Sequence, residues 1–195
     1  MAITTEQIKE LRNATGVSIM QCKKALEEVD GDMEKAQILL RKLSKKAADK
    51  KSDRELGSGI VASYIHGEGS VGSMVELLCE TDFVSKNEEF KTMAREIAMH
   101  IAASAPEYVN ESQIKDVDRE KATEIFKEEV ADKPAEMQDK ILEGKLDAYF
   151  ADKVLMKQNY IKNPEQTIGQ LIEEGIQKFG EKIEIGKISR FSISG

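Results

Sequence analysis

Apolar residues recur at helical spacing near the start of the chain, in three short groups that each follow a polar residue. Thr4, Ser18 and Asp32 precede the groups, and all three are residue types favoured at the N-cap of a helix. Gly16 follows the first group, at the place where a left-handed glycine commonly ends a helix. The pattern predicts three short helices over residues 4–43, which must share a core because single helices of this length are marginal in water.

These helices define the first predicted domain, residues 1–44, whose architecture is like that of a ubiquitin-associated domain. A bundle of this size is near the lower limit for folding alone. A basic segment follows, in which seven of the 14 residues from 41 to 54 are Lys or Arg. Such a run is typical of a solvated helical linker, here residues 45–56, and an electrostatic docking stripe is the alternative.

Alternating apolar residues predict a β-hairpin at the start of the second domain, residues 57–195. Ile60, Ala62 and Tyr64 share one face of the first strand, and a Gly-rich turn separates it from a second strand that ends at Cys79. The glycines of the turn match the dinucleotide fingerprint G-x-G-x-x-G. That fingerprint has to open a helix, whereas a strand is expected here, so nucleotide binding by this turn is disfavoured.

One uninterrupted apolar stripe follows the hairpin. Ser85 and Glu88 have the spacing of a capping box, which predicts a helix that begins at Lys86. The residues expected to face the core recur three and four positions apart, at Phe90, Met93, Ala94, Ile97, Ala98, Ile101 and Ala102. His100 lies beside this stripe and is expected to be a structural residue.

Two highly charged segments are expected to form helices that project from the domain as a pair. They cover residues 118–131 and 134–157, and Pro134 suits the first position of the second helix. The first segment is only weakly amphipathic, so it offers a core little apolar surface. The pair either contacts a partner or shapes an oligomer, and the sequence leaves these two roles open.

The final segments predict one more helix and one more strand. Asn163 and Pro164 of "NPEQ" are expected to cap and open a helix with an apolar stripe that ends at Phe179, and Gly180 is expected to stop this helix. Residues 182–194 alternate like a strand, with Gly186 as a candidate bulge. With the hairpin this gives a three-stranded antiparallel sheet backed by helices, and the predicted fold class is α+β. A sheet this small with one uncovered face favours a partner subunit.

Composition narrows the range of functions. The net charge of −7 disfavours broad binding to a nucleic-acid backbone, which needs a basic excess. No apolar run is long enough to span a membrane and no secretory signal is visible, so a cytoplasmic location is expected. Cys22 and Cys79 match no metal-ligand spacing, and neither His66 nor His100 has a catalytic partner implied by spacing. An enzyme is therefore disfavoured, and no metal or cofactor is expected.

The stretch "ETDFVSKNEEF" contains two residues that neither the preceding strand nor the following helix requires. Asp82 and Phe83 are expected on a loop tip between these two rigid elements. Either Phe83 folds beneath the corner while Asp82 terminates the strand, or the ring is an exposed anchor beside a charge, as at a binding hot spot. The residues alone leave both alternatives open.

Several motifs resemble those of one family. "TDFV" followed by "NEEF" resembles the signature of bacterial elongation factor Ts, and "LRNATGVSIMQCKKALEEVDGDMEKA" is similar to the N-terminal domain of that family. "EIAMHIAASAPEYV", "EGKLDAYF" and the closing "ISRFSI" are similar as well, so the likeness extends from Thr4 to the C-terminus. With a single "TDFV" and no visible internal repeat, the chain resembles the short form of the family.

The resemblance implies a translation elongation factor that acts as a guanine-nucleotide exchange factor for elongation factor Tu. It implies that the TDFV tip enters the G domain of Tu near the Mg²⁺ and phosphate region, with Asp82 and Phe83 in contact and Thr81 and Val84 in support. It also implies that the N-terminal domain docks on another helix of the G domain. The matching candidates are Leu11, Arg12, Ile19, Met20 and Lys23.

Such an exchange factor needs no chemical catalysis, because binding energy alone can shift the partner toward its nucleotide-free state. GDP, GTP and Mg²⁺ would belong to Tu, so the resemblance implies no cofactor and no catalytic residue in this chain. Short forms pair two chains, which implies a homodimer that binds two Tu molecules. The remaining alternative is a non-catalytic adaptor of the ubiquitin-associated type, in which the N-terminal bundle alone binds the target.

Overall fold

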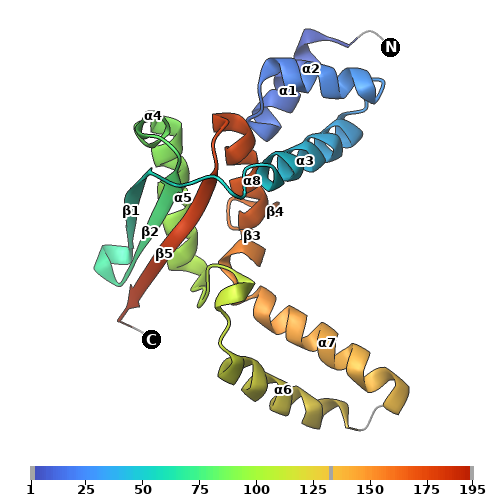
Figure 1. Ribbon diagram of the computed structural model, residues 1–195, viewed down its shortest axis with the longest axis vertical. Coiled ribbons are helices and arrows are strands. Elements are labelled where there is room, and N and C mark those ends of the chain that lie inside the picture. The colour runs from blue at the N-terminus through green and yellow to red at the C-terminus, as the bar shows by residue number, and fades with distance from the viewer. Residues whose placement is uncertain (1–2, 132–133, 194–195) are drawn as a thin grey trace.

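The chain forms three structural parts that follow one another along the molecule (Figure 1). The computed structural model describes residues 3–131 and 134–193. A helical bundle lies at one end, a sheet with helices lies in the middle, and a pair of long helices projects from the opposite end (Figure 1). The predicted α+β class and the three N-terminal helices are confirmed.

The elements have the following bounds. The α-helices are α1 (Thr5–Thr15), α2 (Ile19–Glu28), α3 (Met33–Asp49), α4 (Asp82–Ser85), α5 (Glu88–Ser104), α6 (Asp116–Val130), α7 (Ala135–Ala151) and α8 (Ile168–Phe179). The strands are β1 (Ser58–His66), β2 (Val71–Cys79), β3 (Asn159–Tyr160), β4 (Asn163–Thr167) and β5 (Ile183–Ser192). Short 3-10 turns are η1 (Gly67–Gly69), η2 (Glu111–Gln113) and η3 (Leu155–Lys157).

Each helix of the N-terminal bundle begins at its predicted cap. The Thr4 hydroxyl accepts the backbone N–H of Gln7, and the Gln7 side chain accepts the N–H of Thr4 at 3.0 Å. Ser18 and Asp32 cap α2 and α3, and Gly16 has the expected left-handed backbone with φ 66°. The bundle has its own core, formed by Leu11, Val17, Cys22, Ala25, Leu26, Ala36 and Leu40.

Helix α3 continues past the predicted end of the bundle and joins it to the central part. The sequence predicts a linker from residue 45, but α3 extends to Asp49 and packs along α8. Ser44 is buried at this interface, where its hydroxyl contacts the Gln177 side chain, and Ala48 packs against the central core. The first half of the basic segment therefore belongs to a packed helix, because its apolar side faces α8 while its Lys side chains face water.

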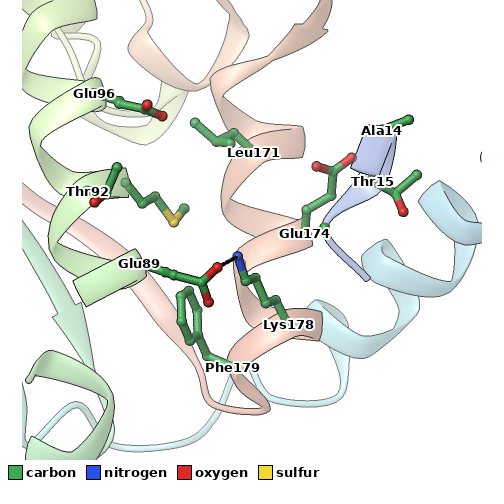
Figure 2. A pocket seen from close by; sticks show the side chains of 12 residues that line it. Ala14, Thr15, Glu89, Thr92, Glu96, Leu171, Glu174, Lys178 and Phe179 are labelled. Atoms are coloured by element: carbon green, nitrogen blue, oxygen red, sulfur yellow. Dashed lines mark hydrogen bonds and ion pairs between the residues drawn. The ribbon is translucent and has the colours of Figure 1, made fainter. Parts of the chain in front are cut away.

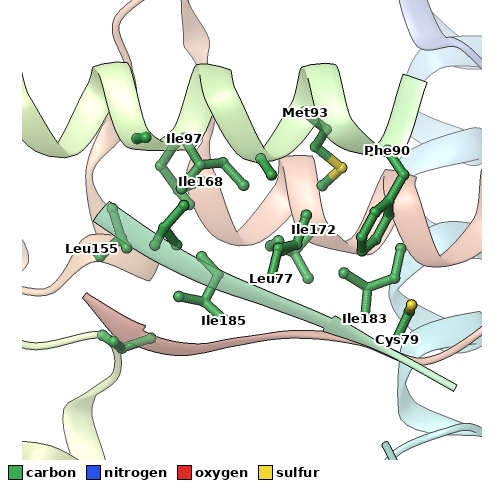
Figure 3. Packing of buried hydrophobic residues seen from close by; sticks show 14 of the residues in the cluster. Leu77, Cys79, Phe90, Met93, Ile97, Leu155, Ile168, Ile172, Ile183 and Ile185 are labelled. Atoms are coloured by element: carbon green, nitrogen blue, oxygen red, sulfur yellow. The ribbon is translucent and has the colours of Figure 1, made fainter. Parts of the chain in front are cut away.

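Strands β1, β2 and β5 form the predicted three-stranded antiparallel sheet, with β2 in the centre. Helices α5 and α8 lie on one side of it, and the central core fills the space between them and the sheet (Figure 3). Phe90 and Ile97 from α5 meet Leu77 from β2 and Ile185 from β5 in this core (Figure 3). The predicted apolar stripe of the long helix is buried throughout.

The predicted bulge near Gly186 is present in β5. Val75 of β2 pairs with Ile188, whereas Leu77 pairs with Ile185, so β5 holds one more residue than β2 between these two pairs. The extra residue twists the strand locally, as bulges do. The pairing therefore resumes in register, and both Ile185 and Ile183 face the core.

Two predicted helix starts are wrong. Helix α5 begins at Glu88 with Asn87 as its cap, whose side chain accepts the N–H of Glu89 at 2.8 Å, so Ser85 is not the cap. Ser85 instead ends the short helix α4 and is buried. Asn is as good an N-cap as Ser. The residues before Asn87, which were expected to form a loop and a cap, instead form the short helix α4.

The segment "NPEQ" also differs from the prediction, because it forms a strand. Residues 163–167 form β4, which pairs with β3, and α8 starts only at Ile168. Thr167 caps this helix, and the side chain of Gln170 completes a capping box with it. The reciprocal Thr–Gln cap satisfies two backbone N–H groups, more than the predicted Asn–Pro start could. The stripe that follows and its left-handed end at Gly180 agree with the prediction.

Helices α6 and α7 form the predicted projecting pair (Figure 1). Both predicted helix ends were too late: α6 ends at Val130, and α7 ends at Ala151 and is followed by the separate turn η3. Lys133, in the predicted connection, lies outside the described residues. After α7, Val154 forms an isolated β-bridge with Tyr108, and both belong to a small core with Ile114, Ala122 and Phe150.

The second face of the sheet is not covered by helices. Val61, Ile65, Met74 and Phe191 all expose large apolar side chains on it. Gly72 lies between Ile65 and Phe191 in the strand register, and the Ile65 side chain leans over it, since a Cβ on Gly72 would lie 2.9 Å from Ile65 Cδ1. The described chain therefore presents an apolar sheet face to its surroundings.

Candidate functional site

The TDFV tip, residues 81–84, lies at the end of β2 and begins a short helix. The sequence predicts a loop tip, but Asp82–Ser85 form one helical turn, α4. The turn has two unlike sides, since Phe83 is 81% exposed whereas Val84 is 3% exposed. The alternative in which Phe83 folds beneath the corner is therefore wrong.

Two buried residues fix the inner side of this turn. Val84 belongs to the central core. The Ser85 hydroxyl accepts a hydrogen bond from the Ser58 hydroxyl at 3.0 Å and donates one to the Asp82 carbonyl at 3.2 Å. The Phe83 ring is thus held out in solvent by a turn whose other side is anchored in the protein.

Asp82 provides a charge beside the ring. The Lys86 ammonium lies 2.6 Å from its carboxylate, and this contact lowers the pKa of Asp82, so the carboxylate is ionised at neutral pH. Both side chains are largely exposed, and an ion pair of this kind contributes little to stability. Asp82 can therefore exchange Lys86 for another partner at little cost.

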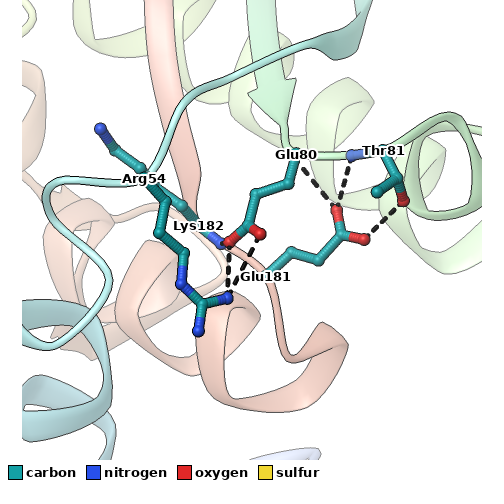
Figure 4. A network of polar contacts seen from close by, with 5 residues as sticks. All are labelled: Arg54, Glu80, Thr81, Glu181 and Lys182. Carbon is teal, nitrogen blue, oxygen red and sulfur yellow. Dashed lines mark hydrogen bonds and ion pairs between the residues drawn. The ribbon is translucent and has the colours of Figure 1, made fainter.

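A polar network fastens the strand end that leads into the tip (Figure 4). The Glu181 carboxylate accepts the backbone N–H groups of Glu80 and Thr81 at 3.1 and 3.0 Å, and it also accepts the Thr81 hydroxyl. The Glu80 carboxylate accepts the backbone N–H of Lys182 and binds the Arg54 guanidinium at 3.1 Å. The N–H of Lys182 and the Arg54 charge lower the pKa of Glu80.

Sequence reasoning missed Glu181 and Arg54. Glu181 is 100 residues from Thr81, and Arg54 is 26 residues from Glu80, so no local spacing links them. The chain holds 36 acidic residues, and a single Glu among them carries no signal of its own. Only the place of Glu181 directly after Gly180, the predicted helix stop, marks it as a junction residue.

The N-terminal candidates divide between surface and core. At the start of α2, Ile19 is 57% and Met20 81% exposed. Arg12 and Lys23 are exposed as well. Leu11 is fully buried in the core of the bundle, so the expectation that it contacts a partner is corrected: it supports α1 from the inside. Figure 1 shows this bundle and the tip on the two sides of the α8 end, away from α6 and α7.

An open groove of about 310 Å³ lies between the N-terminal bundle and the central part (Figure 2). Its acidic side chains already have partners: Glu89 binds Lys178 at 3.0 Å, and Glu174 accepts a hydrogen bond from Gln166 at 2.7 Å. Burial raises the pKa of Glu174. None of the predicted partner-binding residues lines this groove, which is a structural seam between two parts.

Residues 3–131 and 134–193 hold no side-chain cluster suited to metal or thiol chemistry. In these residues no group of His, Cys, Asp and Glu side chains is arranged to hold a metal ion. Cys22 and Cys79 are buried and form no disulfide, and burial raises the pKa of both thiols, so neither is set up as a nucleophile. Across the same residues, none of the helices has the length and apolar character needed to cross a membrane.

Comparison with known proteins decides the family. The family model for elongation factor Ts matches residues 42–195. The chain belongs to this family. A curated elongation factor Ts from Carboxydothermus hydrogenoformans is 46% identical over 193 residues, which cover 98% of this chain and 89% of the relative. The elongation factors Ts from Thermodesulfovibrio yellowstonii and Leptospira biflexa serovar Patoc are 46% and 45% identical and cover 99% and 100% of this chain, and 97% and 100% of their own length.

Membership of the elongation factor Ts family gives the chain a role in translation elongation. The motif resemblance is thereby confirmed, and the similarity to whole relatives includes the N-terminal bundle as well as the tip. The chain spans 89% to 100% of the length of these three relatives.

Proposed function

We propose that the chain is a guanine-nucleotide exchange factor that binds elongation factor Tu with GDP and promotes the loss of GDP. In this proposal the TDFV tip inserts near the Mg²⁺ and phosphate region of the G domain of Tu. GDP, GTP and Mg²⁺ belong to Tu, and the chain catalyses no bond chemistry. The exchange takes place in the cytoplasm, where translation factors act.

The observation that carries the proposal is the exposure of Phe83 on an anchored turn. An aromatic ring left 81% exposed gains free energy when a partner covers it, on the order of 2 kcal/mol. Because Val84 and Ser85 fix the turn in the core, the turn loses little further conformational entropy when the ring inserts into a partner. Asp82 lies beside the ring and can exchange Lys86 for a polar group of Tu.

Thermodynamic linkage explains how insertion releases GDP. If the chain binds empty Tu more tightly than Tu with GDP, then it must weaken GDP binding by the same factor. Phe83 would stabilise an arrangement of the G domain in which the contacts to metal and phosphate are degraded. The rate of release rises because a conformational equilibrium shifts.

A second contact comes from the N-terminal bundle. Ile19 and Met20 form an exposed apolar patch that a partner helix can cover. Arg12 and Lys23 are exposed positive charges on the same bundle. Figure 1 shows the bundle and α4 on different sides of α8, so the bundle and the tip would contact Tu at separate places. The bundle would therefore hold Tu while the tip acts on the nucleotide site.

The proposal includes a homodimer that binds two Tu molecules. The uncovered sheet face exposes Val61, Ile65, Met74 and Phe191, and it contains an open groove of about 630 Å³ around Gly72. Apolar surfaces of this kind on a chain mark association sites. Two copies that pair through this face would pack their two sheets against each other and bury the apolar side chains of both faces.

Release of a fluorescent GDP analogue from Tu tests the exchange activity. Catalytic amounts of the chain should accelerate release, and Phe83→Ala should slow this acceleration by about a hundredfold, the scale of losing a central aromatic anchor. Ile161→Ala is the control, since Ile161 is 40% exposed after β3 and lies outside the proposed contacts and outside the α6–α7 pair. If folded Phe83→Ala keeps the full rate, then the assignment of the tip fails and a simple adaptor bundle gains support.

A further inference from the structure

Glu181 is joined to the start of the TDFV tip by three hydrogen bonds from one carboxylate (Figure 4). One oxygen accepts the N–H groups of both Glu80 and Thr81, and the other accepts the Thr81 hydroxyl. Hydrogen bonds to an ionised carboxylate are roughly twice as strong as those between neutral groups. The backbone just before Asp82 is therefore fixed by a single side chain.

The base of Glu181 is itself rigid. Gly180 ends α8 with a left-handed backbone, φ 75°, and β5 begins at Ile183, so Glu181 stands on a tight junction between a helix and a strand. Both flanking elements belong to the central core. Because the backbone of Glu181 is fixed, its carboxylate holds the start of the tip at a constant position relative to the core.

A second carboxylate makes the connection reciprocal. Glu80 accepts the backbone N–H of Lys182, while Glu181 accepts the backbone N–H of Glu80, so each segment binds the other through a side chain and a main chain. The Arg54 guanidinium lies 3.1 Å from the Glu80 carboxylate and neutralises its charge. We call the contacts among Glu80, Thr81, Glu181 and Lys182 the 80/181 clasp. None of these residues belongs to the predicted contact set except Thr81.

We infer that Glu181 is a positioning residue for nucleotide exchange, which acts through the clasp to hold Phe83 at the angle needed for insertion into the partner GTPase. This inference rests on the proposed function. Phe83 follows Thr81 by two residues on a single helical turn, so a change in the direction of that turn moves the ring directly. Without the clasp, the turn keeps Val84 in the core but loses its fixed start.

Replacement of Glu181 tests the inference in the full chain. Glu181→Ala removes all three acceptors, and release of fluorescent GDP from Tu should slow about tenfold at saturating factor, as misplacement of a functional group does. The factor concentration at half-saturation should change by less than about threefold, because the N-terminal contacts still hold Tu. Glu165→Ala removes an exposed carboxylate on β4, outside the clasp, and should keep the original rate.

Glu181→Gln provides the rescue. The amide oxygen can accept the two N–H groups, and the amide nitrogen can donate to the Thr81 hydroxyl, so the rate should return to within about threefold of the original. Thr81→Val removes only the hydroxyl arm and should give an intermediate loss. Because this variant keeps both backbone contacts, it tests the clasp even if Glu181→Ala fails to fold.

A double-mutant cycle separates positioning from loss of stability. If Glu181 acts through Phe83, then Glu181→Ala should add less than about twofold to the loss already caused by Phe83→Ala. Hydrogen exchange at the amides of Glu80 and Thr81 should speed up at least about tenfold in Glu181→Ala. Additive losses, or unchanged amide exchange and full activity in Glu181→Ala, would overturn the inference. An inactive Phe83→Ala with a fully active Glu181→Ala would sink the inference alone, whereas a fully active Phe83→Ala would sink the proposed function.

Discussion

The Nε2 atom of His100 lies 2.9 Å from Oε1 of Gln158 inside the core, and this pair ties α5 to the segment before β3. Gln158 also donates to the carbonyl groups of Ser104 and Asp152, so its Oε1 must accept from the ring. The second ring nitrogen faces the N–H of Ile161 at 3.4 Å and can only accept there. His100 is therefore held neutral, and burial lowers its pKa.

Stability should depend on pH through His100. The unfolded chain binds a proton at this residue below its ordinary pKa of about 6.5, whereas the folded chain resists protonation because its pKa is lowered. The unfolded state thus binds more protons in this range, so the free energy of unfolding should rise with pH up to about 6.5 and then level off. Urea unfolding at several pH values measures this slope.

Two variants isolate the His100 contribution. His100→Gln removes the titrating ring and should flatten the slope relative to the original chain, while His66→Gln alters the exposed second histidine and should leave it unchanged. Burial raises the pKa values of Glu173 and Glu174, so these two residues make the free energy of unfolding fall as pH rises. Comparing variants removes this contribution, because it is the same in all of them. Equal slopes in all three proteins would refute the role of His100.

The two neighbours in the TDFV tip should differ in their effect on stability. Val84→Ala leaves a cavity in the central core and should lower the free energy of unfolding by about 2 kcal/mol. Phe83→Ala removes an exposed ring and should change it by less than about 0.5 kcal/mol. Chemical denaturation of both variants tests this, and a large loss for Phe83→Ala would mean that the ring is packed in solution.

Two glycines should respond in opposite ways to a methyl group. A Cβ on Gly59 would lie 2.6 Å from the backbone oxygen of Leu77, which cannot move aside, so Gly59→Ala should destabilise by about 2 kcal/mol or more. A Cβ on Gly144 in α7 meets nothing within 4 Å, so Gly144→Ala should stabilise by about 1 kcal/mol through helix propensity. Thermal unfolding of the two variants should shift to opposite sides of the original midpoint.

Dimerisation through the uncovered sheet face should be sensitive to a charge at Phe191, which is 73% exposed there. Phe191→Glu places a carboxylate in the proposed interface and should convert dimer to monomer in sedimentation velocity. Phe83→Glu makes the same substitution at an exposed ring away from the sheet and should leave the dimer intact. A monomer in the original chain at micromolar concentration would contradict the dimer.

Local patterns predicted the elements whose signals are local. The caps at Thr4, Ser18 and Asp32 are visible in sequence because a cap bonds within three residues of itself. The same rule misplaced Ser85, since a second cap at Asn87 competes only two residues away. It also misplaced the start of α8, because Pro164 suits a strand as well as the first turn of a helix.

The parts of the site that could not be predicted depend on distant residues. The exposure of Phe83 follows from Val84 and Ser85 taking the inner side of the turn, and the Ser85 hydroxyl finds its partner in Ser58, which is 27 residues away at the start of β1. Leu11 was expected to contact a partner because the family resemblance implied it, and only the three-dimensional bundle shows that Leu11 lies in a core shared with residues of α2 and α3. Glu181 can be recognised as the partner of Thr81 only when it is known that β5 lies beside β2.

Helix α3 passes without a break from the bundle that carries Ile19 and Met20 to its long contact with α8. If the bundle and the tip both bind Tu as proposed, α3 holds the two contacts at a fixed separation, so that once one contact forms the other occurs at a local concentration that a flexible tether could not reach. Under the proposal, two individually weak contacts would then bind as one, and the complex would still dissociate quickly once either contact opened.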